Sequence, residues 1–329
     1  MPGFLRYACY LRPLAILCAC IAIYALIDIG HTRFLSLNTV RSALQTFATV
    51  APVALGLGLA MMIREFDLSI AGLFGLAGCV AVLAGGAHPL AGLAAALAVG
   101  LAVGLVQGVI IVALRLDSIG VTLGGLLICA GIALVVSNNQ VIGYSNIDVS
   151  ILMGQPLLGV FTIRSLVALG VIVLASVVFH YGRLGRDLIA AGSNRRAAET
   201  AGVDVPAILI AVFGLSGLLT ALSGGLLSYS LASASPAGLS DVLVPAAVAA
   251  ILGGVSLSGG TGHPVSIAIG VLVLAVLRAG ANAVGAPPFV NDLIIGAVLL
   301  AVAIAEGPYL MRRTIGLRRM ISRVAALGR

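Results

Sequence analysis

The feature that most constrains this sequence is a series of uninterrupted apolar runs, each close to the roughly 20 residues that a helix needs to cross a bilayer. Ten runs can be recognised, at 14–30, 42–63, 67–87, 89–114, 119–137, 164–181, 206–231, 242–257, 264–284 and 289–305. A membrane β-barrel would instead show segments of about 10 residues with alternating hydrophobicity. We therefore predict an all-α fold, a polytopic membrane bundle of about ten transmembrane helices.

The composition excludes a water-soluble protein. Hydrophobic residues make up 61% of the chain and charged residues only 9%, whereas a soluble domain carries about 25% charged residues. The longest stretches outside the runs, at 138–163, 182–205 and beyond 306, fall short of the about 50 residues of a small domain. Residues 1–329 are therefore expected to form one transmembrane domain, with no room for an ATPase of its own.

The distribution of arginine predicts the orientation. All 18 basic residues are arginines, and with both termini in the cytoplasm 14 of them lie inside; Arg33, Arg41 and Arg164 lie outside, and Arg278 lies within a run. Because positive charge concentrates on the cytoplasmic side, both termini are predicted to be cytoplasmic. The tail at 307–329, where arginines alternate with apolar residues, is expected to be a basic amphipathic helix on the inner leaflet.

A stripe of small residues crosses the fourth run. Gly100, Gly104 and Gly108 are spaced by four residues and therefore share one helix face, which allows a neighbouring helix to approach closely. We favour packing within the bundle over a seam between subunits. The five cysteines and four histidines show no ligand spacing, so neither a metal site nor a catalytic residue is predicted.

Two charges fall inside the last two runs. Arg278 and Asp292 are costly in lipid and are expected to face an aqueous path or a partner. Asn282 and Asn291 lie nearby in the sequence, so these four residues are predicted to border the outer part of a translocation path. A structural Arg278–Asp292 ion pair is the alternative.

The inner loop at 182–205 predicts a short helix. Ser193 or Asn194 is suited to the N-cap, Arg195 to Ala201 are compatible with a helix, and Gly202 can end it. Alanines are expected on one side of this helix, at Ala197, Ala198 and Ala201. We favour a docking element over a basic loop that only fixes the topology, since topology needs only the arginines.

Two further strings stand at the ends of runs. Asp67 and Ser69 stand at the head of the third run and are suited to helix capping. Residues 253–262 read GGVSLSGGTG, but no Lys-Ser/Thr follows the glycines, as a phosphate-binding loop would require. We therefore predict a tight turn with positive φ.

Three strings together resemble a known family. FDLSIAGLFGLAG, GRDLIAAGSNRRAAETAGVDV and AAVAAILGGVSLSGGTG are similar, in order and spacing, to the permease subunits of bacterial ABC sugar importers, in the branch that takes up ribose, other monosaccharides and autoinducer-2. The resemblance extends from about Leu44 to Ala305.

This resemblance implies a multi-pass inner-membrane subunit that works as a homodimer or heterodimer with two cytoplasmic ATPase subunits and a periplasmic sugar-binding protein. No nucleic-acid partner is expected. ATP and Mg would bind the partner ATPase, and this chain would bind no cofactor. The inner-loop helix would be the coupling helix that docks on the ATPase, through Gly192, Asn194, Arg195, Arg196, Ala197, Ala198 and Gly202.

The family's D-L-S-x-x-G string is matched by Asp67, Leu68, Ser69 and Gly72. Two positions depart from the family pattern. Arg195 replaces the usual acidic residue, and Arg278 replaces a neutral one.

An ion-coupled carrier or channel is the alternative function. It would require titratable groups or broken-helix cages near the midplane, and the mid-run acids are missing. An intramembrane enzyme is disfavoured, because no nucleophile–base pair is visible.

Overall fold

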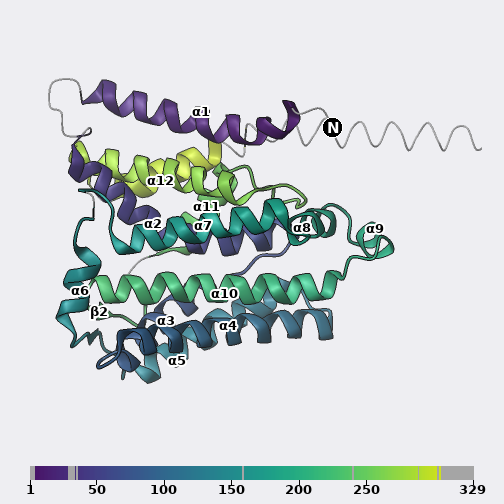
Figure 1. Ribbon diagram of the computed structural model, residues 1–329, viewed down its shortest axis with the longest axis horizontal. Helices are drawn as coiled ribbons and strands as arrows, with labels where there is room; N and C mark the ends of the chain where they lie inside the picture. Colours follow the sequence, from purple (N-terminus) through teal and green to yellow (C-terminus); the bar gives the residue numbers. More distant parts are fainter. Residues whose placement is uncertain are drawn as a thin grey trace, which may run out of the picture.

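The computed structural model describes residues 4–28, 34, 36–157, 159–238, 241–287, 289–301 and 304. The chain is mostly helical (Figure 1). The helices in chain order are α1 (Phe4–Ile27), α2 (Leu37–Met62), α3 (Ile70–Ala84), α4 (Pro89–Leu114), α5 (Ser118–Val136), α6 (Ile147–Gly154), α7 (Ile163–Tyr181), α8 (Leu184–Ser193), α9 (Arg195–Thr200), α10 (Val205–Ser230), α11 (Leu243–Leu252) and α12 (Pro264–Ala283).

The described part of the chain also contains two short strands. β1 (Ile142–Gly143) pairs antiparallel with β2 (Ser233–Ala234). A further apolar helix follows α12, at Phe289–Ala301. The basic tail predicted at 307–329 lies outside the described residues.

Six helices are long and apolar enough to cross a membrane: α2, α4, α5, α7, α10 and α12. The shorter apolar helices are α3, α11, the segment Tyr10–Leu26 of α1 and Phe289–Ala301. A helix therefore lies in each of the ten predicted runs. However, the 15 residues of α3 rise only about 22 Å. The helical part of the third run is therefore shorter than the roughly 30 Å hydrocarbon core of a bilayer.

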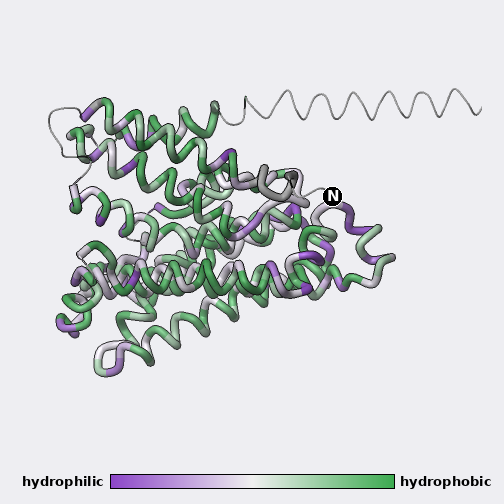
Figure 2. Tube along the Cα trace, turned by 45° about the horizontal axis from the view of Figure 1, so that its top comes forward, coloured by the Kyte–Doolittle hydropathy of each residue, from purple (hydrophilic) through white to green (hydrophobic). Residues whose placement is uncertain are grey.

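Of the six long apolar helices, α2, α12 and α10 are the most enclosed. α10 packs against α4, α3 and α2, and α2 packs against α12, α11 and α7. Helices α4, α5 and α7 bury less than a third of their most apolar windows, so many of their apolar side chains face outward, as lipid-facing helices require. Figure 2 shows hydrophobic residues along the helices and hydrophilic residues mainly at their ends and in loops.

The bundle has two distinct ends (Figure 1). Helices α8 and α9 lie at one end, and α6 and β2 lie at the other, which we call the distal end. Because α7 leads into α8, residue Ile163 at its start lies at the distal end. Because α10 follows α9, residue Ser230 at its end lies there too.

The glycine stripe of α4 packs on α10 within the same chain. A Cβ atom added at Gly104 would lie 2.1 Å from the Phe213 carbonyl oxygen, and one added at Gly217 would lie 2.1 Å from the Gly100 oxygen. Gly108 lies against the backbone of Ile210. The two backbones are thus in near contact, as small-residue stripes permit, and the stripe forms a seam inside the bundle.

Candidate functional site

A polar cavity of about 410 Å³ opens among four helices at the distal end. Its lining combines residues of α2, α7, α10 and α12. The polar side chains that line it are Gln45, Thr46, Thr49, Arg164, Ser230 and Arg278. Hydroxyl, amide and guanidinium groups together can bind a hydroxyl-rich or negatively charged solute.

Arg164 is the most deeply enclosed of these groups, with 4% of its surface exposed. Its guanidinium donates to Gln45 Oε1 at 3.0 Å, to Thr49 Oγ1 at 2.5 Å and to Ser230 Oγ at 3.3 Å. Its Nε is buried without a hydrogen-bond partner. A capping box between Thr162 and Ser165 fixes the first turn of α7, which carries Arg164.

Arg164 is not among the predicted site residues, because an arginine between two apolar runs signals only the topology of the chain. The second run contains a sequence pattern that indicates this cavity. Gln45 and Thr49 are four residues apart and therefore share a helix face, so they form a polar patch on an otherwise apolar helix.

Arg278 lines the same cavity; its place beside a translocation path remains a prediction. Its Nε is also buried without a partner. The alternative ion pair with Asp292 is not formed: no salt bridge joins the two among the described residues, and Asp292 is exposed.

Asn282 and Asn291, which are also predicted to border the path, lie together but outside the cavity lining. Asn291 Nδ2 donates to Asn282 Oδ1 at 3.2 Å, in an exposed position in the last turn of α12. Asp292 follows Asn291 directly. The structure therefore brings Asn282 and Asn291 into contact, while only Arg278 of the four lines the cavity.

Asp67 is buried rather than placed at an exposed boundary, with 1% of its surface exposed. Its Oδ1 accepts bonds from the Ser69 backbone nitrogen at 3.0 Å and from Ser69 Oγ at 2.6 Å. Its Oδ2 accepts from Ser216 Oγ of α10 at 2.6 Å. The predicted capping role is therefore wrong, since the N-cap of α3 is Ser69 and has no side-chain capping bond. One oxygen of Asp67 closes a local turn with Ser69, and the other connects the link before α3 to α10.

The rest of the D-L-S-x-x-G string attaches α3 to its neighbour. A Cβ atom at Gly72 would lie 2.3 Å from the Leu126 carbonyl oxygen of α5. Leu68 is half-buried. The string therefore fixes α3 against both α10 and α5, a structural role that the sequence spacing did not predict.

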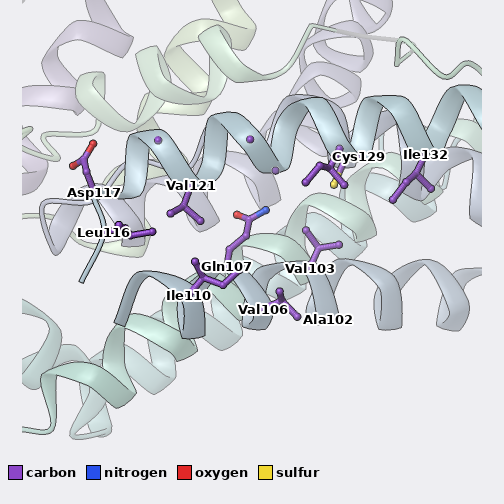
Figure 3. Close-up of a pocket in the computed structure, with 14 residues that line it drawn as sticks. Ala102, Val103, Val106, Gln107, Ile110, Leu116, Asp117, Val121, Cys129 and Ile132 are labelled. Atoms are coloured by element: carbon purple, nitrogen blue, oxygen red, sulfur yellow. The ribbon is translucent and has the colours of Figure 1, made fainter. Parts of the chain in front are cut away.

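A largely apolar groove of about 720 Å³ runs between α4 and α5 (Figure 3). Gln107 projects from α4 towards α5 and is 5% exposed. Neither of its side-chain polar atoms has a hydrogen-bond partner among the described residues.

The inner-loop helix forms as predicted in its local structure. Asn194 Oδ1 accepts a bond from the Ala197 nitrogen at 3.2 Å, so Asn194 caps α9. Gly202 takes a φ of +84°, the left-handed conformation expected after a helix end. The capped helix with a glycine stop is therefore confirmed as a structural element.

One face of this helix was assigned wrongly. Ala197 and Ala201 are exposed, but Ala198 is 4% exposed and packs in the core of its own chain. The three alanines therefore do not share an open side. The link to α10 turns back on Ala198, since the Val203 nitrogen donates to the Ala198 oxygen at 3.0 Å.

Two of the three strings that carry the family resemblance meet beside this helix, together with the residues just before the first string. We call this region the α8–α9 junction (62–65, 192–195 and 259–260). Arg64 Nη2 donates to the Ser193 oxygen at 2.7 Å, and the Gly260 nitrogen donates to the Met62 oxygen at 2.8 Å. A Cβ at Gly192 would lie 1.9 Å from the Met62 oxygen. Gly192 is therefore a close-packing position of the chain itself.

The turn after α11 has the predicted conformation. The glycines with positive φ are Gly254, Gly259, Gly260 and Gly262. Two of them contact the junction, since a Cβ at Gly259 would lie 2.4 Å from Arg64 Cγ and one at Gly260 would lie 2.5 Å from Ser193 Oγ.

Arg195 is not free to meet a partner protein. Its Nη2 donates to the Ile63 carbonyl oxygen at 3.0 Å and forms an ion pair with Glu65. Arg196 is exposed and has no hydrogen bond or ion pair among the described residues. Arg195 therefore stabilises the junction, whereas Arg196 is the basic group presented outward.

Reversing the Arg195–Glu65 pair provides a test of the junction. We expect Arg195→Glu to lower the stability by about 1 kcal/mol or more, because it places a second acid beside Glu65. The double variant Arg195→Glu with Glu65→Arg should recover most of that loss in thermal unfolding measured in detergent. Equal destabilisation by the single and double variants would show that the pair contributes nothing.

His263 is the N-cap of α12, and its Nδ1 accepts a bond from the Val265 nitrogen at 3.2 Å. Burial, and then the nearby His180, lower the pKa of His263. The folded state thus favours the neutral ring, so stability is present above the unfolded pKa of about 6.5 and decreases as pH falls below it.

Thermal unfolding between about pH 5 and pH 8 should show this decrease. His263→Asn, which keeps a capping side chain but cannot titrate, should flatten the acidic part of the profile. An identical profile for both proteins would assign the dependence to other groups.

Within the described residues, no group of three histidine, cysteine or acidic side chains could hold a metal ion. Apolar helices surround a polar cavity at one end, and a capped basic helix projects from the other. These features define a multi-pass membrane transport protein.

The particular family follows from comparison. Residues 39–303 match the family described as "Branched-chain amino acid transport system / permease component", and the chain belongs to this family. Its resemblance to ABC sugar-importer permeases is confirmed by curated relatives that align over most of its length.

The chain is 33% identical over 296 residues to the ribose import permease protein RbsC of Escherichia coli, covering 88% of this chain and 91% of that protein. It is 28% identical over 293 residues to the L-arabinose ABC transporter permease protein AraH of Azospirillum brasilense, covering 87% and 85%. It is 27% identical over 301 residues to the autoinducer 2 import system permease protein LsrC of Photorhabdus luminescens, covering 90% of each. No solved structure matches the chain significantly.

Proposed function

We propose that this chain forms the translocation path of an ATP-binding-cassette importer for a monosaccharide or similar small polyol, delivered by a periplasmic binding protein. The polar distal cavity carries this proposal. Its neutral groups, Gln45, Thr46, Thr49 and Ser230, can exchange hydrogen bonds with sugar hydroxyls. The names of the relatives support the same solute class, since two of them are permeases for ribose and L-arabinose.

The energy source in this proposal is a separate ATPase. ATP and Mg bind that partner, and this chain binds no cofactor. Helix α9 is the proposed contact with the ATPase, supported by its position at the end of the bundle and its exposed Arg196, Ala197 and Ala201. The assembly contains two permeases, as a homodimer or a heterodimer, and two ATPase subunits.

The proposed topology has ten membrane helices and both termini in the cytoplasm, with the chain in the bacterial inner membrane. The arginine distribution supports it. The distal cavity then faces the periplasm, where a binding protein releases its solute, and α8 and α9 face the cytoplasm.

The function can be tested in vesicles reconstituted with the permease, a partner ATPase and a periplasmic binding protein. We expect labelled sugar to be taken up when ATP is supplied on the side of the membrane that carries the ATPase. Ionophores should leave this uptake unchanged. Uptake by the permease alone, driven by a proton or sodium gradient, would instead establish an ion-coupled carrier.

A further inference from the structure

The distal cavity contains two guanidinium groups and no acidic side chain in its lining. A solute made only of hydroxyl groups has no need of such charge. The two arginines come from separate helices, Arg164 from α7 and Arg278 from α12. Their presence in one cavity therefore calls for a physical explanation.

Burying an ionised arginine without a counter-charge is unfavourable. The bonds of Arg164 go to the neutral oxygens of Gln45, Thr49 and Ser230, and no acidic side chain forms an ion pair with it among the described residues. Its Nε remains buried and unpartnered. The protein thus holds a cation in place and leaves part of its hydrogen-bonding capacity unused.

Contacts within the protein explain the buried position of Arg278 even less well than that of Arg164. It makes no hydrogen bond among the described residues, and its Nε is buried without a partner. Asp241 and Asp292 lie within electrostatic range, but neither forms an ion pair with it in the described part of the chain. A purely structural role would require contacts that Arg278 does not make.

We propose that the transported solute is a polyhydroxylated anion, a sugar acid or a sugar phosphate, whose carboxylate or phosphate is received by Arg278 together with Arg164. The planar guanidinium matches both oxyanions and can bind them through paired hydrogen bonds. Gln45, Thr46 and Ser230 would contact the hydroxyl groups of the same solute. This inference rests on the proposed function and makes its solute class more specific.

The experiment compares anionic and neutral polyols of matched size. The probes are gluconate against glucitol, and ribose 5-phosphate against ribose. Each is tested as labelled solute or competitor in vesicles holding the complete importer, and as a ligand that raises the melting temperature of the detergent-solubilised permease. Activity of gluconate alone would identify a carboxylate, and activity of ribose 5-phosphate alone a phosphate.

The variant Arg278→Gln is chosen because this arginine holds no helix in place, whereas Arg164→Gln removes bonds between three helices. We expect Arg278→Gln to weaken the apparent affinity for the active anion about tenfold or more, the effect of losing a charged hydrogen bond. Arg41→Gln is the matched control. Arg41 also lies near the distal end, but it donates to the Gly154 oxygen at 2.9 Å and does not line the cavity.

The outcomes separate this inference from the function on which it rests. ATP-driven uptake of ribose or glucitol, with no effect of either anion and no effect of Arg278→Gln, overturns the inference and leaves the importer function standing. If no solute is taken up with ATP, the importer function fails. In that case only the melting temperatures test the inference, and equal shifts with anionic and neutral probes overturn it.

Discussion

Replacing Gly104 by leucine is expected to prevent stable folding of this permease. The new Cβ would lie 2.1 Å from the Phe213 carbonyl oxygen and 3.0 Å from Gly214 Cα, and backbone atoms cannot move aside as a flexible side chain can. Accommodating the side chain would separate α4 from α10, which also bury Gly100 against Gly217. We expect a loss of about 3 kcal/mol or more, visible as a low yield of monodisperse protein in detergent and a lowered melting temperature.

Gly170→Leu is the matched control for this prediction. Gly170 lies within α7, it is exposed, and a Cβ there would meet no atom within 4 Å. Because leucine is the better helix former by about 0.8 kcal/mol, this variant should be as stable as the parent or slightly more so. Equal behaviour of the two leucine variants would show that the α4–α10 contact tolerates separation.

The helices were predictable because the information lies in short stretches of sequence. A bilayer requires long apolar runs, and glycines four residues apart share a face whatever the helix packs against. Gly100, Gly104 and Gly108 therefore predicted a close contact, but their partner α10 lies more than 100 residues later. The identity of a packing partner depends on tertiary structure, which spacing along one helix does not contain.

The same distinction explains the errors at the sites. Asp67 was interpreted through its nearest neighbours, whereas Ser216, which donates to its second oxygen, lies 149 residues away. Arg164 was counted as an outer charge, because a topology rule registers the side of the membrane and not the direction of a side chain. Arg278 could be singled out from the sequence, since a charge inside an apolar run is conspicuous by itself, and it lines the candidate cavity.

In helix α9 the predicted ends agree with the structure, whereas the predicted exposed face does not. Asn194 and Gly202 determine where it begins and ends, and both act within a few residues. Which alanine points outward depends on how α9 packs on the rest of the chain, and in this packing Ala198 lies in the core while Ala197 is exposed. The choice of a probe for the partner surface therefore follows from the structure.

Replacing Ala197 by tryptophan is expected to abolish ATP-driven uptake while leaving the permease folded. The indole would stand on the exposed side of α9, at the end of the bundle that we propose contacts the ATPase (Figure 1). A close contact with a partner groove excludes so large a group, and the loss of one central contact weakens an interface by about tenfold or more. The measurements are co-purification with the ATPase, uptake in vesicles, and the melting temperature of the isolated permease.

Ala198→Trp in the adjacent position controls for damage to the permease itself. Because Ala198 is 4% exposed, an indole there must displace the chain's own core and should lower the melting temperature, whether or not a partner is present. The smaller change Ala197→Ser should preserve both assembly and uptake. Normal co-purification and uptake with Ala197→Trp would exclude α9 as the ATPase contact, and its exposed Arg196 would then serve only to set the orientation of the chain.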